Sequence, residues 1–300
     1  MRATRRAVLA GAGAALAMPA LGAAAGGALR KPVPATGELV PAVGLGSWIT
    51  FNVGGDPLLR AECRAVLSAF FEEGGGMVDS SPMYGSSQEV IGDGLAKLGR
   101  PAGLFSADKV WTRARNGPAQ IAETARRWGV ERFDLLQVHN LIDWEANLDT
   151  LEAMKEAGAT RYTGVTTSHG RRHAELEEAM RRRPPDFVQL TYNIVDREAE
   201  RRLLPLAKER GIAVICNRPF RRGRLPDRLA GEPMPGWAAE IGVSTWPQFL
   251  LKFILSHPAV TTAIPATRRV DHLIENKSAA LGPMPDAAMR RRMAAHVRGL

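Results

Sequence analysis

The sequence predicts an α/β protein whose folded domain is a closed (β/α)8 barrel, the TIM-barrel architecture. The chain has 300 residues, 45% of them hydrophobic and 24% charged, which is enough apolar material for a sizeable core. Eight short apolar runs recur along it, with amphipathic helical patterns between them. An open dinucleotide-binding sheet would usually show G-x-G-x-x-G opening a helix after a strand, and no such segment is present.

The eight apolar runs are the expected strands of the barrel. They are short and rich in Val, Ile, Leu, Phe or Thr, and few of them alternate strictly between apolar and polar residues. Such runs are typical of strands that are buried on both faces. They lie at residues 42–48, 76–80, 103–110, 133–139, 162–168, 186–193, 211–217 and 260–266.

Helical patterns fill the intervals and have recognisable ends. One begins at Pro57, and two others end at Gly158 and Gly211. The stretch 218–244 is rich in Pro and Gly and is expected to be a long loop. Because no boundary between two domains is visible, residues 33–300 are expected to form one barrel domain, which ends in a basic surface helix packed over the bottom of the barrel.

Residues 1–25 have the pattern of an export signal. Arg2, Arg5 and Arg6 precede a weakly apolar run of Ala, Gly and Leu that ends in small residues. The adjacent arginines resemble the twin-arginine type, which predicts export to the periplasm after folding. The protein would be cytoplasmic if the signal is not used. The alternative is a basic tail before a membrane anchor, but the apolar run is short for a span, so we expect no stable membrane insertion after signal removal.

Charge and cysteine content exclude several classes of function. The formal net charge is +9, but no basic run is interleaved with aromatic residues, so we expect no nucleic-acid partner. Basic loops that meet an anionic cofactor explain the charge better. Cys63 and Cys216 form no C-x-x-C pair, and we expect neither a disulfide nor a redox centre. His169 and His173 have the spacing of zinc ligands on a helix, but without a third ligand we expect no metal.

Four polar side chains fall at the ends of neighbouring expected strands. Asp79 ends the second strand, and Tyr84 lies in the loop beyond it. Lys109 ends the third strand and His139 the fourth. Because the chemistry of such barrels lies at the C-terminal ends of the strands, we expect the four side chains to converge.

The residue types define what this group could do. A tyrosine is a poor acid at neutral pH, and a nearby ammonium would lower its pKa. An aspartate would orient that lysine, and a neutral histidine could hydrogen-bond the same substrate oxygen. Together they could protonate a carbonyl oxygen as it gains negative charge. Because none of them is a hydride source, a redox reaction would need a cofactor.

Over residues 33–281 the sequence resembles the aldo-keto reductase family. The segment GELVPAVGLGSW resembles the family's opening hairpin and first strand, and VDSSPMYGSSQEVIGDGL resembles its strand-2 signature. LFSADKV is similar to its lysine strand and FDLLQVHN to its histidine strand. The resemblance implies a nicotinamide dinucleotide cofactor and a catalytic tetrad. In that tetrad Tyr84 is the proton donor, Lys109 lowers its pKa, Asp79 supports Lys109, and His139 orients the carbonyl.

The cofactor side also resembles the family. The segment VQLTYN implies that Gln189 binds the nicotinamide carboxamide and that Tyr192 stacks on the ring. Thr166 and Thr167 stand where the family usually has Ser and Asn, which leaves the orientation of the nicotinamide open. The segments CNRPFRRGRL and IPATRRVDHLIEN resemble the pyrophosphate loop and the last phosphate motif. The other cofactor-binding residues implied are Gly46, Arg218, Arg221, Thr267, Arg268, His272, Glu275 and Asn276.

These features predict NAD(P)H-dependent reduction of an aldehyde or ketone to an alcohol, or the reverse. NADPH is favoured over NADH because Arg268 can pair with a 2′-phosphate. The small-molecule carbonyl substrate would meet an apolar pocket. Its candidate residues follow the first four strands: Trp48, Phe51, Met83, Trp111 and Asn140. The alternative is a cofactor-binding sensor or interaction protein on the same barrel with little or no catalysis, since nicotinamide cofactors are not expected outside the cytoplasm.

Overall fold

The computed structural model describes residues 27–300, so the expected export signal lies outside the described residues. Within residues 27–300, none of the helices has the length and apolar character needed to span a membrane. Cys63 and Cys216 are both buried and free.

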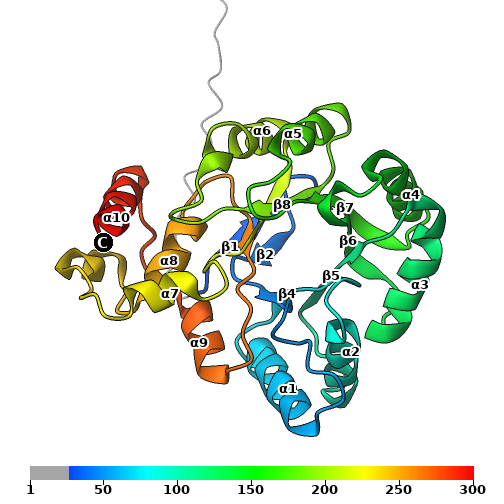
Figure 1. Ribbon diagram of the computed structural model, residues 1–300, viewed down its shortest axis with the longest axis horizontal. Coiled ribbons are helices and arrows are strands. Elements are labelled where there is room, and N and C mark those ends of the chain that lie inside the picture. The colour runs from blue at the N-terminus through cyan, green and yellow to red at the C-terminus, as the bar shows by residue number, and fades with distance from the viewer. Residues whose placement is uncertain (1–26) are drawn as a thin grey trace, which may run out of the picture.

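Eight parallel strands form the barrel and follow one another in chain order (Figure 1). Bridges from Val43 to Ala263 and from Gly46 to Ala266 join the first strand region to the last, which closes the sheet. The predicted (β/α)8 barrel is therefore confirmed. The barrel strands are β3 Leu45–Gly46, β4 Gly76–Asp79, β5 Leu104–Val110, β6 Phe133–Val138, β7 Thr160–Thr166, β8 Phe187–Thr191, β9 Ala213–Asn217 and β10 Thr262–Ala263.

Helices cover the outside of the barrel (Figure 1). The first begins at Pro57 as expected, and the side chain of Asp56 accepts hydrogen bonds from the first turn. The α-helices are α1 Pro57–Glu72, α2 Ser87–Lys97, α3 Gly117–Trp128, α4 Trp144–Glu156, α5 His173–Arg182, α6 Leu203–Arg210, α7 Arg224–Leu229, α8 Trp246–Leu255, α9 Val270–Ser278 and α10 Ala287–Gly299. Short 3-10 helices lie at η1 Ala114–Asn116, η2 His139–Leu141, η3 Glu198–Glu200 and η4 Gly236–Ile241.

An antiparallel hairpin closes the N-terminal end of the barrel. Its strands are β1 Arg30–Pro32 and β2 Leu39–Pro41. Val33 and Val40 of the hairpin belong to the same buried cluster as Phe105, which comes from the early part of β5. Because the hairpin covers this end, only the C-terminal ends of the strands are open to form a site.

The stretch 218–244, expected as a long loop, contains α7 and η4. The C-terminal helix α10 packs beside it (Figure 1). The ring of His296 stacks on Trp246 with a centroid distance of 6.1 Å, and Arg228 donates a hydrogen bond to the carbonyl oxygen of Val297. The C-terminal helix therefore lies on the side of the barrel and not over its bottom, where the sequence led us to expect it.

Candidate active site

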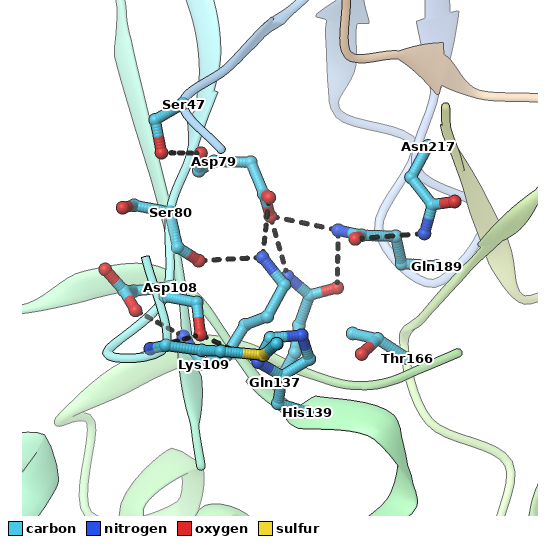
Figure 2. Close-up of polar contacts among 12 residues, drawn as sticks. Ser47, Asp79, Ser80, Asp108, Lys109, Gln137, His139, Thr166, Gln189 and Asn217 are labelled. Carbon is cyan, nitrogen blue, oxygen red and sulfur yellow. Dashed lines mark hydrogen bonds and ion pairs between the residues drawn. The ribbon is translucent and has the colours of Figure 1, made fainter. Parts of the chain in front are cut away.

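A buried ion pair lies at the centre of the site (Figure 2). Asp79 ends β4 and Lys109 lies near the end of β5, so the neighbouring strands bring Lys109 Nζ to 2.5 Å from Asp79 Oδ2. Nζ also donates a hydrogen bond of 2.7 Å to the carbonyl oxygen of Ser80. Burial opposes the charged form of Lys109, but the charge and hydrogen bond of Asp79 together with Tyr84 and Asp108 outweigh it and raise the pKa of Lys109. Lys109 is therefore a permanent cation at neutral pH.

Two glutamine amides hold the other oxygen of the Asp79 carboxylate (Figure 2). The distances to Oδ1 are 3.1 Å from Gln137 Nε2 and 2.9 Å from Gln189 Nε2. Sequence reasoning missed Gln137, although it lies two residues before His139 on one strand and so faces the same side. It also missed Asn217, at the end of β9, whose Nδ2 lies 3.4 Å from Gln189 Oε1.

Tyr84 and His139 meet beside this pair. Their ring centroids are 5.7 Å apart and their planes are nearly perpendicular, and Lys109 Nζ lies 5.2 Å from the centroid of the Tyr84 ring. Ser81 Oγ lies 2.7 Å from His139 Nδ1 and also accepts a hydrogen bond from the backbone of Met83. When Ser81 donates its hydroxyl hydrogen to Nδ1, the hydrogen of the neutral ring lies on Nε2. Burial and the charge of Lys109 lower the pKa of His139 well below its usual value, so the ring is neutral.

The acidity of Tyr84 differs from the expectation. Burial raises the pKa of Tyr84 to about 12, and the positive charge of Lys109 offsets only part of that rise. Taking a phenolate out of water therefore outweighs the attraction of one ammonium, and Asp79 acts against the phenolate as well. The predicted lowering by Lys109 is present, but the net shift is upward. Tyr84 keeps its proton across the neutral range, as a proton donor must.

A cavity of about 790 Å³ opens at the C-terminal end of the barrel. It runs from the Tyr84–His139 corner past Gln189 to Trp246 and Asn276. Lys109 is buried behind Asp79 and does not line it. The predicted residues that do line it are Gly46, Trp48, Asp79, Met83, Tyr84, His139, Asn140, Thr166, Thr167, Gln189, Arg218, Thr267, His272, Glu275 and Asn276.

Tyr192 does not face the cavity. It lies on the outer side of the barrel, where its hydroxyl donates a 2.5 Å hydrogen bond to Glu200 and its ring contacts Phe253. Side chains along a strand alternate between faces, so Gln189 and Tyr192, three residues apart, face opposite sides. The prediction that Tyr192 stacks on a nicotinamide ring is therefore wrong.

Four other predicted residues also lie outside the lining of this cavity. Arg221 pairs with Asp196 at 2.9 Å, and Arg268 pairs with Glu62 of α1 at 2.8 Å. Phe51 is fully buried in the core. Trp111 lines a second cavity of about 410 Å³, which shares His139 and Asn140 with the first.

His169 lies at the edge of the large cavity and contacts Arg218. Its Nε2 is 2.7 Å from Arg218 Nη1, so the neutral ring accepts a hydrogen bond from the guanidinium. Burial and the surrounding arginines lower the pKa of His169, which favours that neutral form. Within residues 27–300 no group of three or more His, Cys, Asp or Glu side chains could hold a metal.

The remaining polar groups of the cavity fit a dinucleotide. Arg218 and Arg222 line it, and neither forms an ion pair with any residue in the described range 27–300. Burial and the charge of Arg222 lower the pKa of Arg218, so an anion placed here would relieve both effects. Thr167 Oγ1 and Arg218 Nε are buried without a hydrogen-bond partner in this part of the chain. Arginines of this kind match a diphosphate, and Gln189 and Thr167 match a carboxamide.

The sequence model of the Aldo/keto reductase family matches residues 42–295, which include the whole site. The chain belongs to this family. A protein of Escherichia coli (strain K12) named NADH-specific methylglyoxal reductase is 26% identical over 249 residues, covering 70% of this aldo-keto reductase and 72% of its own length.

Solved structures of other aldo-keto reductases share the fold. One from Klebsiella pneumoniae, in complex with NADP and acetate, has a TM-score of 0.73 and 24% identity, and the match covers 87% of this chain and 93% of that one. The thermostable aldo-keto reductase Tm1743, in complex with the inhibitor epalrestat, has a TM-score of 0.73 and 28% identity, with coverages of 89% and 99%.

Proposed function

We propose that this aldo-keto reductase reduces an aldehyde or ketone to an alcohol with NADPH, and that Tyr84 gives the proton. The observation that carries the proposal is the convergence of a protonated phenol and a neutral imidazole at one wall of the cavity, with a buried ammonium behind them. The cations Arg218 and Arg222 lie along the same cavity. A proton donor and a binding site for an anionic cofactor are therefore adjacent.

Each residue of the tetrad has a separate task. A bound NADPH would supply the hydride that the carbonyl carbon accepts. Nε2–H of His139 can hydrogen-bond the carbonyl oxygen and hold it beside the Tyr84 hydroxyl. As that oxygen gains negative charge, the phenol proton passes to it, and the Lys109 ammonium stabilises the negative charge left on Tyr84. Asp79 keeps Lys109 in place.

The preference for NADPH depends on Arg268 as a partner for the 2′-phosphate, because Arg218 and Arg222 match the diphosphate that NADPH and NADH share. The Klebsiella pneumoniae structure contains NADP, whereas the Escherichia coli relative is named for NADH. Arg268 bonds Glu62 and must leave it to reach a 2′-phosphate. We expect Glu62→Gln to tighten NADPH binding and leave NADH binding unchanged, and Arg268→Ala to weaken NADPH binding only. Equal effects on both dinucleotides would contradict this role of Arg268.

Binding and turnover together test the proposed reaction. Trp48 and Trp246 line the cavity, so tryptophan fluorescence should report dinucleotide binding. NADPH consumption would then be followed with a panel of small aldehydes and ketones that includes methylglyoxal. We expect Tyr84→Phe to bind NADPH as the wild type does and to lose turnover by about a hundredfold or more. NADPH binding with no turnover of any carbonyl by the wild type would favour the sensor alternative.

We also propose that the chain is exported by the twin-arginine route to the periplasm. The support is the sequence of residues 1–25, in which Arg5 and Arg6 precede an apolar run with small residues at its end. We expect a shortened N-terminus in the periplasmic fraction. Replacement of Arg5 and Arg6 by Lys should leave the full-length chain in the cytoplasm. A wild-type chain that stays unprocessed in the cytoplasm would contradict export.

A further inference from the structure

A fully buried carboxyl group lies directly behind the catalytic lysine and has no part in the reaction described above. Asp108 precedes Lys109 on β5, and its side chain points out of the barrel to partners on α2 and α3. Its oxygens accept hydrogen bonds from Gln88 Nε2 at 3.0 and 3.1 Å and from Trp128 Nε1 at 2.6 Å. The backbone N–H of Lys109 donates a further one at 2.6 Å. Because every partner is a donor, this site is built for a carboxylate.

The charges around Lys109 are unequal in number. Two carboxylates, Asp79 and Asp108, stand against one ammonium, and only Asp79 contacts it. The direct partners of Asp108 are an amide, an indole and a backbone N–H, so no cation among them neutralises it. Its charge therefore acts at longer range on Lys109 and Tyr84, through an interior of low dielectric constant.

The side chains of the neighbouring helices that contact Asp108 are uncharged. The charged residues of these helices form ion pairs elsewhere: Glu89 of α2 with Arg60, Asp93 with Lys97, and Glu123 of α3 with Arg126 and Arg127. Helix α2 contributes Gln88, and α3 contributes Trp128 and Thr124, which hydrogen-bonds Gln88. The charged groups that act on Asp108 are Lys109 of its own strand and Asp79 of β4. Burial raises the pKa of Asp108 to about 7, although Lys109 and the hydrogen-bond donors act in the opposite direction.

We propose that Asp108 is a positioning residue whose buried charge acts through Lys109 and makes Tyr84 a weaker proton donor. The inference rests on the proposed reduction. An ionised Asp108 adds negative charge near Tyr84 and opposes the phenolate that forms as the proton leaves, and a neutral Asp108 does not. His139 titrates well below neutrality and Tyr84 near pH 12, so Asp108 is the member of this group that changes charge near pH 7.

Two variants with matched packing separate charge from structure. Trp128→Phe removes one hydrogen-bond donor to Asp108 and keeps its charge. Asp108→Asn added to Trp128→Phe removes the charge as well. In this double variant the asparagine oxygen can accept from the Lys109 backbone, and its amide can donate to Gln88 once the Gln88 amide turns over. In this arrangement each buried hydrogen-bond donor around residue 108 faces an acceptor and not another donor.

The pH profile of reduction distinguishes the two variants. For the wild type, kcat/KM should fall by about 3- to 10-fold as pH rises from about 6 to about 8, a modest effect because proton transfer follows only part of a change in acidity. Trp128→Phe should show the same fall at higher pH, because its Asp108 carboxylate has lost a hydrogen-bond donor. The double variant should keep the value seen at low pH. The same fall in the double variant would overturn the proposal.

The wild-type protein provides a test that needs no charge-changing variant. The indole N–H of Trp128 donates to Asp108, and its NMR signal is identified by its loss in Trp128→Phe. This signal should titrate with a midpoint near pH 7, and the pH profile of reduction should show the same midpoint. An indole signal that does not change between about pH 5 and pH 9, or midpoints that differ, would overturn the proposal.

Tyrosinate absorbance tests the effect on Tyr84 without any turnover. Its ionisation, isolated by subtracting the matching Tyr84→Phe proteins, should have a midpoint about one pH unit lower in the double variant than in Trp128→Phe. Equal midpoints would overturn the role of Asp108 even if the protein reduces carbonyls. A lower midpoint in a protein that reduces no carbonyl would sustain the electrostatic coupling while the proposed function fails.

Discussion

The hydroxyl of Tyr192 donates a hydrogen bond to the carboxylate of Glu200 on the outer side of the barrel. Arg290 of α10 donates hydrogen bonds to both groups, and its guanidinium lies over the ring of Phe253. Burial raises the pKa of Tyr192 above its ordinary value, so the hydroxyl stays protonated and keeps this bond. Tyr192 therefore links β8 to η3 and to the C-terminal helix.

Replacing Tyr192 by Phe should lower stability and leave cofactor binding unchanged. Loss of the hydroxyl removes a buried partner of Glu200 and Arg290, which is expected to lower the free energy of unfolding by about 1–2 kcal/mol. Urea denaturation measures the first effect and fluorescence titration with NADPH the second. A tenfold weaker NADPH complex at unchanged stability would mean that the Tyr192 hydroxyl reaches the bound cofactor.

The Asp79–Lys109 pair should behave as a unit in stability. Lys109→Met leaves a buried carboxylate without its cation and is expected to lower the free energy of unfolding by about 3–5 kcal/mol. Lys109→Met combined with Asp79→Asn removes both charges and should recover a large part of that loss in denaturant unfolding. Both proteins should lack reductase activity, because neither stabilises the charge left on Tyr84. A double variant no more stable than Lys109→Met would contradict the coupling.

The turn that follows His139 is strained and is held by Arg172. Asn140, Leu141 and Asp143 have positive φ angles of 51°, 55° and 42°, which is unfavourable for residues with a side chain. Arg172 donates hydrogen bonds to the backbone carbonyl oxygens of Asn140 and Leu141. The turn joins His139 to α4, so its conformation affects where the imidazole lies.

Arg172→Ala should therefore reduce turnover more than cofactor binding. We expect kcat/KM to fall by about tenfold or more, since a displacement of about 1 Å in a catalytic group can have an effect of that size. The affinity for NADPH should not change. Arg171→Ala, an exposed neighbour, is the matched control and should behave as the wild type. Equal losses in both variants would show that the two carbonyl contacts do not hold the site.

Gly92 should tolerate no side chain. An alanine Cβ at this position would lie 1.9 Å from the carbonyl oxygen of Arg127, because α2 packs closely against the end of α3 there. Gly92→Ala is expected to lower the free energy of unfolding by about 1–3 kcal/mol or more, measured by thermal or urea unfolding. Gly55→Ala, where no atom lies within 4 Å, is the control. A Gly92→Ala protein as stable as that control would contradict the packing.

The barrel and the tetrad could be predicted because both depend on local patterns. Each strand is an apolar run, and in a parallel barrel the ends of such runs must meet. Asp79, Lys109 and His139 each end one run, so their convergence followed from the chain order alone. Gln137 could have been found in the same way, since it lies two residues before His139.

Other features depend on contacts that are distant in the sequence. Tyr192 faces outward, and the strand alternation from Gln189 could have shown this, but its partner Arg290 lies on the last helix. Arg268 turns to Glu62, more than two hundred residues earlier in the chain. The rise in the pKa of Tyr84 depends on burial, which no spacing of residues reveals. The net effect of burial and nearby charges on a pKa can be judged only from the three-dimensional structure.

The most direct test of the central claim traces the hydrogen that NADPH would transfer to the carbonyl carbon. NADPH deuterated at the transferable position of its nicotinamide would be incubated with an aldehyde that the wild type consumes, and the product would be analysed by mass spectrometry. We predict an alcohol with deuterium on the former carbonyl carbon from the wild type, and about a hundredfold less of it from Tyr84→Phe. An alcohol without deuterium, or equal amounts from both proteins, would contradict reduction by NADPH with Tyr84 as the proton donor.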